Sequence, residues 1–339
     1  MEITRGQWII IILLTLTFIA TAGFVAFGLA AVLSFGPAYL YLKSIRNSEE
    51  TDKEPWSALQ TAFVWGAVSG VFYALILNGL GGSLVFLYSG NDADLTFVLT
   101  AIIVAPIVEE FVKPLVLFRN ASVKGEIDEV EDGIVYGAAC GLGFGATENI
   151  LYGLSEGAVS SGLLGVIIIV TLRTVSSILL HLTASSFAGY GISQYLVKGA
   201  PFSVVVKYYF LAVLIHAAWN TAAVLGSPLI LIFSILLAIG GLEFSKRRIR
   251  ELDLEGSNIS PNSLRSDGSQ STDYSNSDWW EKSKSNWGKK ADERNERTAS
   301  PIFESNTESP ASSMFQNIDW RQTLGGLFFL FYILSGIIF

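Results

Sequence analysis

The sequence predicts an all-α fold: a polytopic membrane helix bundle with about eight transmembrane helices, or about nine if one long run crosses twice. Of its 339 residues, 51% are hydrophobic and 15% are charged, whereas a soluble domain carries roughly 25% charged residues. The mean hydropathy is positive, and several apolar runs reach the roughly 20 residues that a helix needs to cross a bilayer. The single cysteine, Cys140, excludes an intrachain disulfide framework.

The candidate spans are the long apolar stretches of the chain. These stretches are residues 8–42, 57–80, 95–118, 132–153, 161–197, 203–225, 228–244 and 323–339. Two of them exceed the roughly 20 residues of one crossing. The stretch 8–42 is long enough for two short helices broken near Gly23, and the sequence leaves the number of N-terminal helices open. We expect 161–197 to contain a short in-plane or re-entrant helix before the span itself.

The loops between these stretches alternate in charge. Lysines and arginines lie in loops 43–56, 119–131 and 198–207 and directly after residue 244, whereas loops 81–94 and 154–160 contain none. The positive-inside rule places the basic loops in the cytoplasm. The sequence therefore predicts a multi-pass protein of the cell membrane, surrounded by the lipid bilayer.

A polar segment near the C-terminus divides the chain into three parts. Residues 253–319 are rich in Ser, Asn, Asp, Glu and Lys and show no apolar period, which is typical of a disordered linker. We expect a multi-span membrane domain at 1–250, a disordered cytoplasmic linker at 251–321 and a C-terminal transmembrane helix at 322–339. Much of the acid behind the net charge of −8 lies in this polar segment, so the charge does not identify a partner. No nucleic-acid partner is predicted.

Ionisable side chains occur at similar depths in four of the predicted spans. They are Glu109, Glu110 and Lys113 in one run, Glu148 in the next, and the two histidines of the chain, His181 and His216, in two further runs. Helical rise places them roughly 15–24 Å into the membrane. A charge at the centre of a membrane helix costs about 2.5–3.5 kcal/mol on insertion scales, whereas a leucine returns about 0.5 kcal/mol. We therefore expect these groups to face the bundle interior, to pair and to form a functional site.

Helical spacing indicates which groups face the same way. Glu109 and Lys113 are four residues apart with the acid first, which is the favourable order for an ion pair. Glu110 is rotated by about 100° from Glu109 around the helix axis and can face another group. Three further pairs share a helix face: His216 with Asn220, Phe144 with Glu148, and Arg173 with His181.

In this order, the residues resemble the pattern of the PrsW family of intramembrane proteases, which is distantly similar to the CAAX prenyl endopeptidases. The matching positions are Glu109, Glu110 and Lys113; Phe144, Glu148 and Asn149; Arg173 and His181; and His216 and Asn220. The resemblance covers about residues 35–245. It implies hydrolysis of peptide bonds in membrane-protein substrates, often anti-sigma factors or similar single-span regulators.

Peptide hydrolysis inside a membrane needs a base for water, a donor for the oxyanion and a wet cavity. The preferred interpretation is a glutamic-type site. Its predicted roles are Glu110 as base, helped by Glu148 or His181; His216 with Asn220 at the oxyanion; and Glu109, Lys113 and Arg173 as the supporting ion network.

A zinc-dependent mechanism is the alternative within the protease interpretation. His181, His216 and Glu148 are the residue types that bind zinc, and a carboxylate can then activate the bound water. The chain has no HExxH helix, so these ligands would come from separate helices. No other cofactor is predicted.

Two alternatives outside proteolysis stay open. An ion-coupled transporter is one, because buried Glu, Lys, Arg and His also form proton relays; carriers usually show internal inverted repeats, and we find none in the sequence. A catalytically inactive membrane scaffold is the other. The sequence does not indicate the substrate, the cleaved bond or the oligomeric state.

Overall fold

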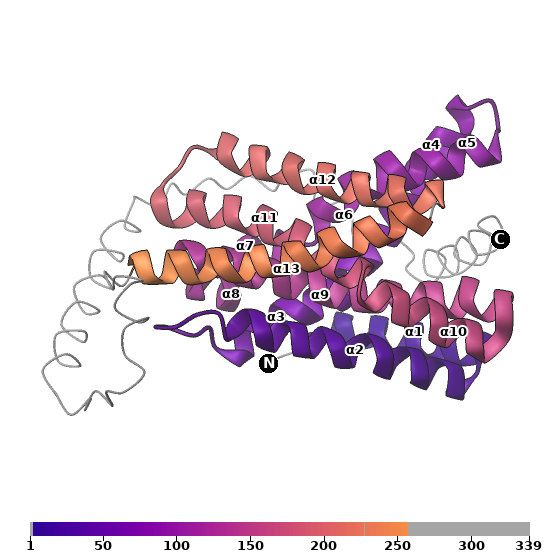
Figure 1. Ribbon diagram of the computed structural model, residues 1–339, viewed down its shortest axis with the longest axis horizontal. Helices are drawn as coiled ribbons and strands as arrows, with labels where there is room; N and C mark the ends of the chain where they lie inside the picture. The colour runs from indigo at the N-terminus through magenta and orange to yellow at the C-terminus, as the bar shows by residue number, and fades with distance from the viewer. Residues whose placement is uncertain (1–2, 227, 257–339) are drawn as a thin grey trace, which may run out of the picture. The chain divides into compact units, whose positions relative to one another are not determined.

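The computed structural model describes residues 3–226 and 228–256, and every regular element in these ranges is a helix (Figure 1). The prediction of an all-α helix bundle is thereby confirmed. The described residues belong to one compact unit, Met1–Leu264. The helix expected at 322–339, and the expected linker beyond Gly256, lie outside the described residues.

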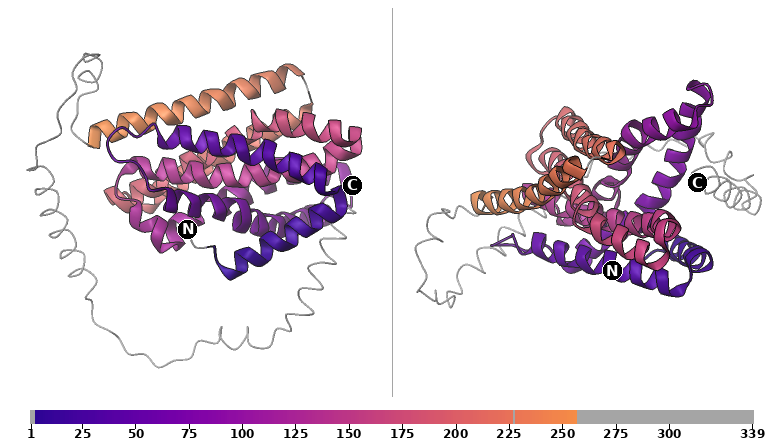
Figure 2. Two further views of the ribbon diagram at one scale, coloured as in Figure 1. Left: turned by 90° about the horizontal axis from the view of Figure 1, so that it is seen from below. Right: turned by 45° about the vertical axis from the view of Figure 1, so that its right-hand side comes forward.

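The first apolar stretch forms two helices, which is one of the arrangements that the sequence leaves open. Helix α1 is Arg5–Ala22 and helix α2 is Phe24–Arg46. They are separated by Gly23, whose φ of 82° is in a region that glycine adopts without steric cost. The left view of Figure 2 shows that α1 and α2 run at an angle to one another rather than as one straight helix.

The next two spans are long helices interrupted by π-helical turns, which widen a helix locally and are frequent near functional sites. The first comprises α3 (Trp56–Val64), η1 (Trp65–Gly70) and α4 (Val71–Tyr88). The second comprises α5 (Ala93–Leu99), η2 (Thr100–Val104), α6 (Ala105–Val112) and α7 (Leu115–Arg119). The short helix α8, Ala121–Glu126, follows.

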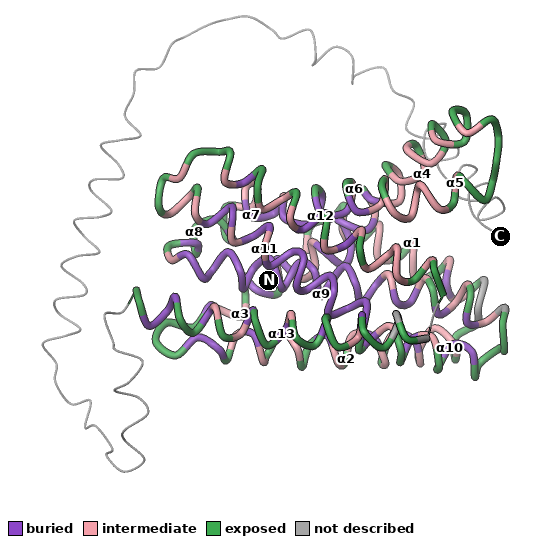
Figure 3. Tube along the Cα trace, turned by 45° about the horizontal axis from the view of Figure 1, so that its top comes forward, coloured by how far each residue is buried: buried purple, intermediate pink, exposed green. Residues whose placement is uncertain are grey.

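Helix α9, Val130–Tyr152, forms the centre of the bundle. It packs against α11 (Ser177–Lys198) and also against α2, α3 and η1, and Figure 3 shows both α9 and α11 as largely buried. Glycines permit this close approach: a Cβ atom on Gly141 would lie 2.2 Å from the backbone oxygen of His181. Small residues at helix contacts are the usual means of packing in membranes.

The long apolar stretch after α9 forms two helices, and the in-plane or re-entrant character expected of the first one stays a prediction. The turn η3 (Gly153–Gly157) leads into α10 (Ala158–Thr174), which has a kink at Ser161 and Gly162. A second break at Val175 and Ser176 separates α10 from α11. This break begins two residues after Arg173.

The described chain ends with α12, Phe202–Leu225, and α13, Pro228–Gly256. Helix α13 packs against α9, α11 and α12. It extends past residue 250, so the expected boundary between membrane domain and linker falls inside a helix.

Within the ranges that the structure describes, five helical segments are long and apolar enough to cross a membrane. They are Phe24–Arg46, Trp56–Tyr88, Ala93–Arg119, Ser160–Lys198 and Phe202–Leu225. Arg5–Ala20 is a shorter apolar helix. The total of about eight spans stays a prediction.

Candidate active site

Four helices contribute ionisable side chains to one cluster in the interior of the bundle. Glu109 and Glu110 lie on α6, Glu148 on α9, His181 on α11 and His216 on α12. All of these residues except Glu148 are at least 95% buried. The structure therefore brings together residues that are more than 100 positions apart in the sequence.

Lys113 forms the cationic centre of the cluster. Its Nζ atom lies 2.6 Å from Glu110 Oε1 and 3.9 Å from Glu109 Oε2, so its shorter ion pair is with Glu110 and not with the predicted partner Glu109. The same Nζ atom lies 2.8 Å from His181 Nδ1 and 4.5 Å from the centre of the Phe144 ring. This side chain is fully buried, and its contacts supply the pairing that a buried charge requires.

Glu110 is a fully engaged carboxylate. Its Oε1 atom accepts hydrogen bonds from Lys113 Nζ at 2.6 Å and from His216 Nδ1 at 2.8 Å. Its Oε2 atom accepts from the hydroxyl of Ser185 at 3.2 Å. Glu110 therefore orients Lys113 and His216 and has no uncommitted oxygen in this arrangement.

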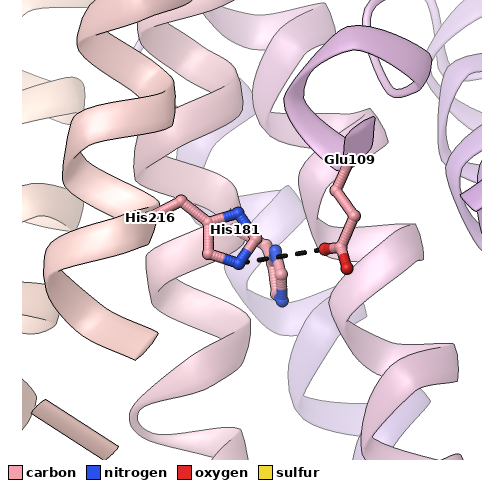
Figure 4. Close-up of side chains that lie close together, drawn as sticks. All are labelled: Glu109, His181 and His216. Carbon is pink, nitrogen blue, oxygen red and sulfur yellow. Dashed lines mark ion pairs between the residues drawn. The ribbon is translucent and has the colours of Figure 1, made fainter. Parts of the chain in front are cut away.

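Glu109 and His216 each direct toward the other an atom that forms no hydrogen bond. Because His216 Nδ1 donates to Glu110, its Nε2 atom carries the lone pair, and this atom lies 3.8 Å from Glu109 Oε2 (Figure 4). Glu109 Oε1 accepts from Asn78 Nδ2 at 3.2 Å, whereas its buried Oε2 has no hydrogen-bond partner. A buried oxygen without a partner is costly, so this pair of atoms points to a water or an ion between them.

His181 bridges the two halves of the cluster. Its Nδ1 atom faces Lys113, and its Nε2 atom lies 2.9 Å from Glu148 Oε2. Since a lysine ammonium can only donate, Nδ1 accepts and Nε2–H donates to Glu148. The rings of His181 and His216 meet edge to face with centroids 4.9 Å apart.

Glu148 is held by one oxygen only. Its Oε2 atom accepts from Arg173 Nη2 at 2.6 Å, from His181 Nε2 at 2.9 Å and from Ser177 Oγ at 3.4 Å. Among the residues that the structure describes, none forms a hydrogen bond with Oε1, and the side chain is 16% exposed, against 6% for Glu109 and 0% for Glu110. Glu148 is thus the carboxylate of the cluster that water or a substrate can reach most directly.

Arg173 and Asn149 fix the position of Glu148. Arg173 Nε donates to Asn149 Oδ1 at 3.1 Å, and the guanidinium lies 3.8 Å from the centre of the Tyr152 ring. Asn149 Nδ2 donates in turn to the hydroxyl of Thr174 at 3.2 Å. The planar guanidinium is suited to such simultaneous hydrogen bonding and stacking.

The donor set fits a metal ion. Glu109, His181 and His216 each offer one ligand atom, and these atoms all lie within 4.8 Å of one another. Two histidines and a glutamate form a known zinc ligand set, and the Glu110–His216 hydrogen bond is the type of contact that orients a ligating histidine. Sequence reasoning placed Glu148 in this set, whereas the structure groups Glu109 with the histidines.

Three polar residues contact the cluster that the sequence analysis did not include, and a fourth, which it did include, forms a hydrogen bond elsewhere. Asn78, Ser177 and Ser185 each bond a carboxylate of the cluster. Asn78 was detectable by the same argument as the charges, since an amide in an apolar run also needs a partner, whereas the two serines carry no such signal. Asn220 donates from Nδ2 to the carbonyl of Ala101 at 2.8 Å, so this donor holds η2, and the role of Asn220 at the oxyanion stays a prediction.

Comparison with known proteins identifies the family. The model of the PrsW family of intramembrane metalloproteases matches residues 54–240, which include every residue of the cluster. The chain belongs to this family. The family resemblance that the sequence analysis stated is therefore confirmed.

Three curated relatives support the assignment to the PrsW family. Protease PrsW of Clostridioides difficile is 32% identical over 184 residues, which cover 54% of this chain and 73% of the relative. Protease PrsW of Geobacillus kaustophilus is 34% identical over 125 residues, and that of Bacillus subtilis is 30% identical over 125 residues. These two matches cover 35% of this chain and 48% and 49% of the relatives. No solved structure matches the chain at a significant level.

PrsW membership and the apolar helices make this chain a multi-pass protein of the cell membrane. Membership in a protease family also favours the prediction of an intramembrane protease over the transporter alternative.

Proposed function

We propose that the chain is an active intramembrane endopeptidase that hydrolyses peptide bonds of membrane-protein substrates, with single-span regulators of the anti-sigma-factor type as the expected class. The observation that carries this proposal is the pair of uncommitted atoms, Glu109 Oε2 and His216 Nε2, 3.8 Å apart beside His181. Apart from the long ion-pair contact with Lys113 Nζ at 3.9 Å, Glu109 Oε2 has no hydrogen bond, whereas most buried polar atoms have one.

We assign the metal-binding role to Glu109, His181 and His216. When bound at such a set, a zinc ion lowers the pKa of a water molecule and polarises a carbonyl group. Glu110 contributes by holding the His216 ring with Nε2 directed toward Glu109. Lys113 supplies positive charge between Glu110 and His181, which offsets part of the negative charge of three neighbouring carboxylates.

We assign the general base to Glu148. Its Oε2 atom is anchored by Arg173, His181 and Ser177, so its Oε1 atom is held in a fixed position and is free to accept a proton from water. A base must have an accessible lone pair within reach of its substrate. Glu110, the base that the sequence suggested, has both oxygens engaged in the structure.

Substrate access is proposed from the side of Glu148 and Arg173. Their side chains are 16% and 22% exposed, whereas those of His181 and His216 are 1% and 2% exposed. The break between α10 and α11 lies beside Arg173, and irregular backbone at membrane depth is tolerated where it lines a cavity. An extended segment of a substrate would therefore meet Glu148 before it meets the histidines.

A metal-free glutamic mechanism is the second candidate, and one observation favours it. Both nitrogens of His181 are engaged, one with Lys113 and the other with Glu148. His181 would have to give up one of these contacts to ligate a metal. In the metal-free alternative, Glu148 and His181 act on water without an ion.

The deciding experiment measures metal content and proteolysis with the same preparations. The purified full chain is assayed in detergent against a panel of single-span membrane proteins, and its metal content is measured before and after treatment with a chelator. We expect about one zinc per chain, with cleavage lost after chelation and restored by zinc. Glu109→Gln and His216→Ala should lose both metal and cleavage, whereas the exposed control Glu126→Gln should retain both.

Cleavage that persists without metal, in the chelated protein and in Glu109→Gln, would support the glutamic mechanism and reject the metal assignment. Two negative results together would support the inactive scaffold instead. In detergent, the wild-type chain would cleave no membrane protein of the panel. In cells, the membrane peptides would be the same with the wild type as with Glu109→Gln.

A further inference from the structure

A second group of buried carboxyl groups lies away from the histidine cluster, where the loop after α2 meets the start of α9. Glu49 and Glu54 belong to the loop 47–55, and Asp132 lies in the first turn of α9. One oxygen from each of the three residues lies within 4.8 Å of the others. The three residues are 1%, 6% and 3% exposed, respectively.

Backbone N–H groups and Tyr136 bond one oxygen of each of the three residues, and Asp132 and Glu54 also share a side-chain hydrogen bond. Glu49 Oε2 accepts from the backbone N–H of Glu54 at 3.0 Å. Asp132 Oδ2 accepts from the backbone N–H groups of Asp128 and Glu129 at 2.9 and 2.6 Å, which caps α9. Glu54 Oε2 accepts from the hydroxyl of Tyr136.

One atom of the group points directly to a missing ligand. Glu49 is only 1% exposed, and its buried Oε1 atom has no hydrogen-bond partner. Leaving a buried acceptor unpaired costs roughly 1–3 kcal/mol, and more for a charged group. A cation bound beside this oxygen would supply the partner that the described protein atoms do not provide.

No basic side chain in the described ranges forms an ion pair with these three carboxylates. The nearby Arg46 donates from Nε to the backbone oxygen of Glu54 at 2.6 Å, and its guanidinium lies 5.1 Å from the centre of the Trp56 ring. Its charge is thus directed to a carbonyl and an aromatic face. Without a paired cation, burial disfavours the charged form of these three carboxyl groups.

We propose that Glu49, Glu54 and Asp132 form a binding site for a hard divalent cation, Ca²⁺ or Mg²⁺. All donor atoms are oxygens, which are the ligands that these cations prefer. The histidine cluster contains nitrogen donors and suits a different metal class. A cation bound here would join the loop after α2 to the start of α9, the helix that carries Glu148.

The neighbouring acidic group is less suited to the same role. Glu129, Glu131 and Asp253 also place one oxygen each within 4.8 Å. However, both oxygens of Asp253 are already engaged, by the backbone N–H groups of Glu50 and Thr51 and by the hydroxyl of Thr51. Asp253 thus joins α13 to the loop through hydrogen bonds.

The test is a titration of Ca²⁺ and, separately, of Mg²⁺ into the purified full chain in detergent by isothermal titration calorimetry, after removal of divalent cations. We expect saturable binding of at least one of the two cations. Glu49→Gln should weaken that binding about tenfold or more. The exposed control Glu126→Gln should bind as the wild type does, and so should the double variant His181→Ala/His216→Ala, which separates this site from the histidine cluster.

Three results would overturn the proposal: no saturable binding of either cation by the wild type at millimolar concentration, equal binding by Glu49→Gln, or loss of binding in the histidine variant. A second measurement uses the wild type alone, so it does not require any variant to fold. Hydrogen exchange in the peptide covering 47–55 should slow when the cation is added, and unchanged exchange there would equally reject the site.

Discussion

His216 donates from Nδ1 to Glu110 Oε1 at 2.8 Å, and this contact determines which nitrogen of the only histidine on α12 is available for chemistry. With Nδ1 protonated, Nε2 keeps its lone pair and faces Glu109 Oε2 at 3.8 Å. Glu110 therefore acts on the reaction through the orientation of His216 and not through a free oxygen of its own.

Replacing Glu110 with Gln tests this positioning role. The amide is nearly isosteric and its oxygen can still accept a hydrogen bond, but it carries no charge and so holds Lys113 and the Nδ1–H tautomer of His216 more weakly than a carboxylate does. We expect cleavage and metal affinity to fall about 10- to 100-fold, as is typical for partners that orient a metal ligand, with normal protein levels. Glu109→Gln should abolish both. Unchanged metal affinity in Glu110→Gln would contradict the role.

Asn78 is predicted to orient Glu109. Its Nδ2 atom donates to Glu109 Oε1 at 3.2 Å, which directs Oε2 toward His216. Asn78→Ala should reduce metal affinity and the cleavage rate about tenfold or more, because Glu109 can then rotate. Ser83→Ala on the same helix is the matched control, since the Ser83 hydroxyl bonds only the carbonyl of Gly79. Equal behaviour of the two variants would reject the prediction.

Arg173 is predicted to act through geometry as well as charge. Arg173→Lys keeps the positive charge but cannot contact Glu148 and Asn149 together while stacking on Tyr152. We expect the cleavage rate to fall about tenfold or more in this variant, and to fall further in Arg173→Met. Full activity of the lysine variant would show that the charge alone is sufficient.

Gly141 is predicted to set the distance between α9 and α11. A Cβ atom there would lie 2.2 Å from the backbone oxygen of His181, so the helices would have to separate. We expect Gly141→Ala to lower the unfolding free energy by about 1–3 kcal/mol or more and to reduce cleavage. Gly28→Ala is the control, because nothing lies within 4 Å of a Cβ atom at Gly28. Thermal unfolding in detergent measures both variants.

Stability in cation-free buffer should depend on pH through Glu49 and Glu54. Burial raises the pKa of each from 4.5 to about 8, and the negative charges of Asp132 and Asp253 add to the effect at Glu49, while Arg46 and the Glu54 N–H oppose it. At Glu54, hydrogen bonds from Asp132 and Tyr136 oppose the rise, and the charges of Glu49 and Asp128 add to it.

The sign of this pH dependence follows from proton linkage. The folded chain keeps these protons up to about pH 8, whereas the unfolded chain loses them near 4.5, so folding binds protons and stability falls as pH rises through this window. The unfolding midpoint of the wild type should therefore fall more steeply between these pH values than that of Glu49→Gln. Parallel curves for the two proteins would contradict this expectation.

The sequence alone was sufficient for the fold class, and it indicated Gly23 as a candidate break and an additional helix before α11. These follow from local properties: apolar runs predict spans, and a glycine or an excess of length predicts an interruption. Family membership was also accessible, because Glu109, Glu110, Lys113, Glu148, His181 and His216 occur in a recognisable order. The high cost of each ionisable group in a membrane makes such groups visible in a single sequence.

Only the tertiary structure decided which atoms in the cluster are free. Helical spacing paired Lys113 with Glu109, but the shorter ion pair is with Glu110. Helical spacing also placed Asn220 on the same face of its helix as His216. Only the structure shows that Asn220 Nδ2 donates to the carbonyl of Ala101. Spacing along one helix describes only which side chains share a face. Which oxygen accepts from which donor depends on the neighbouring helices, whose position is set by packing such as that between Gly141 and His181.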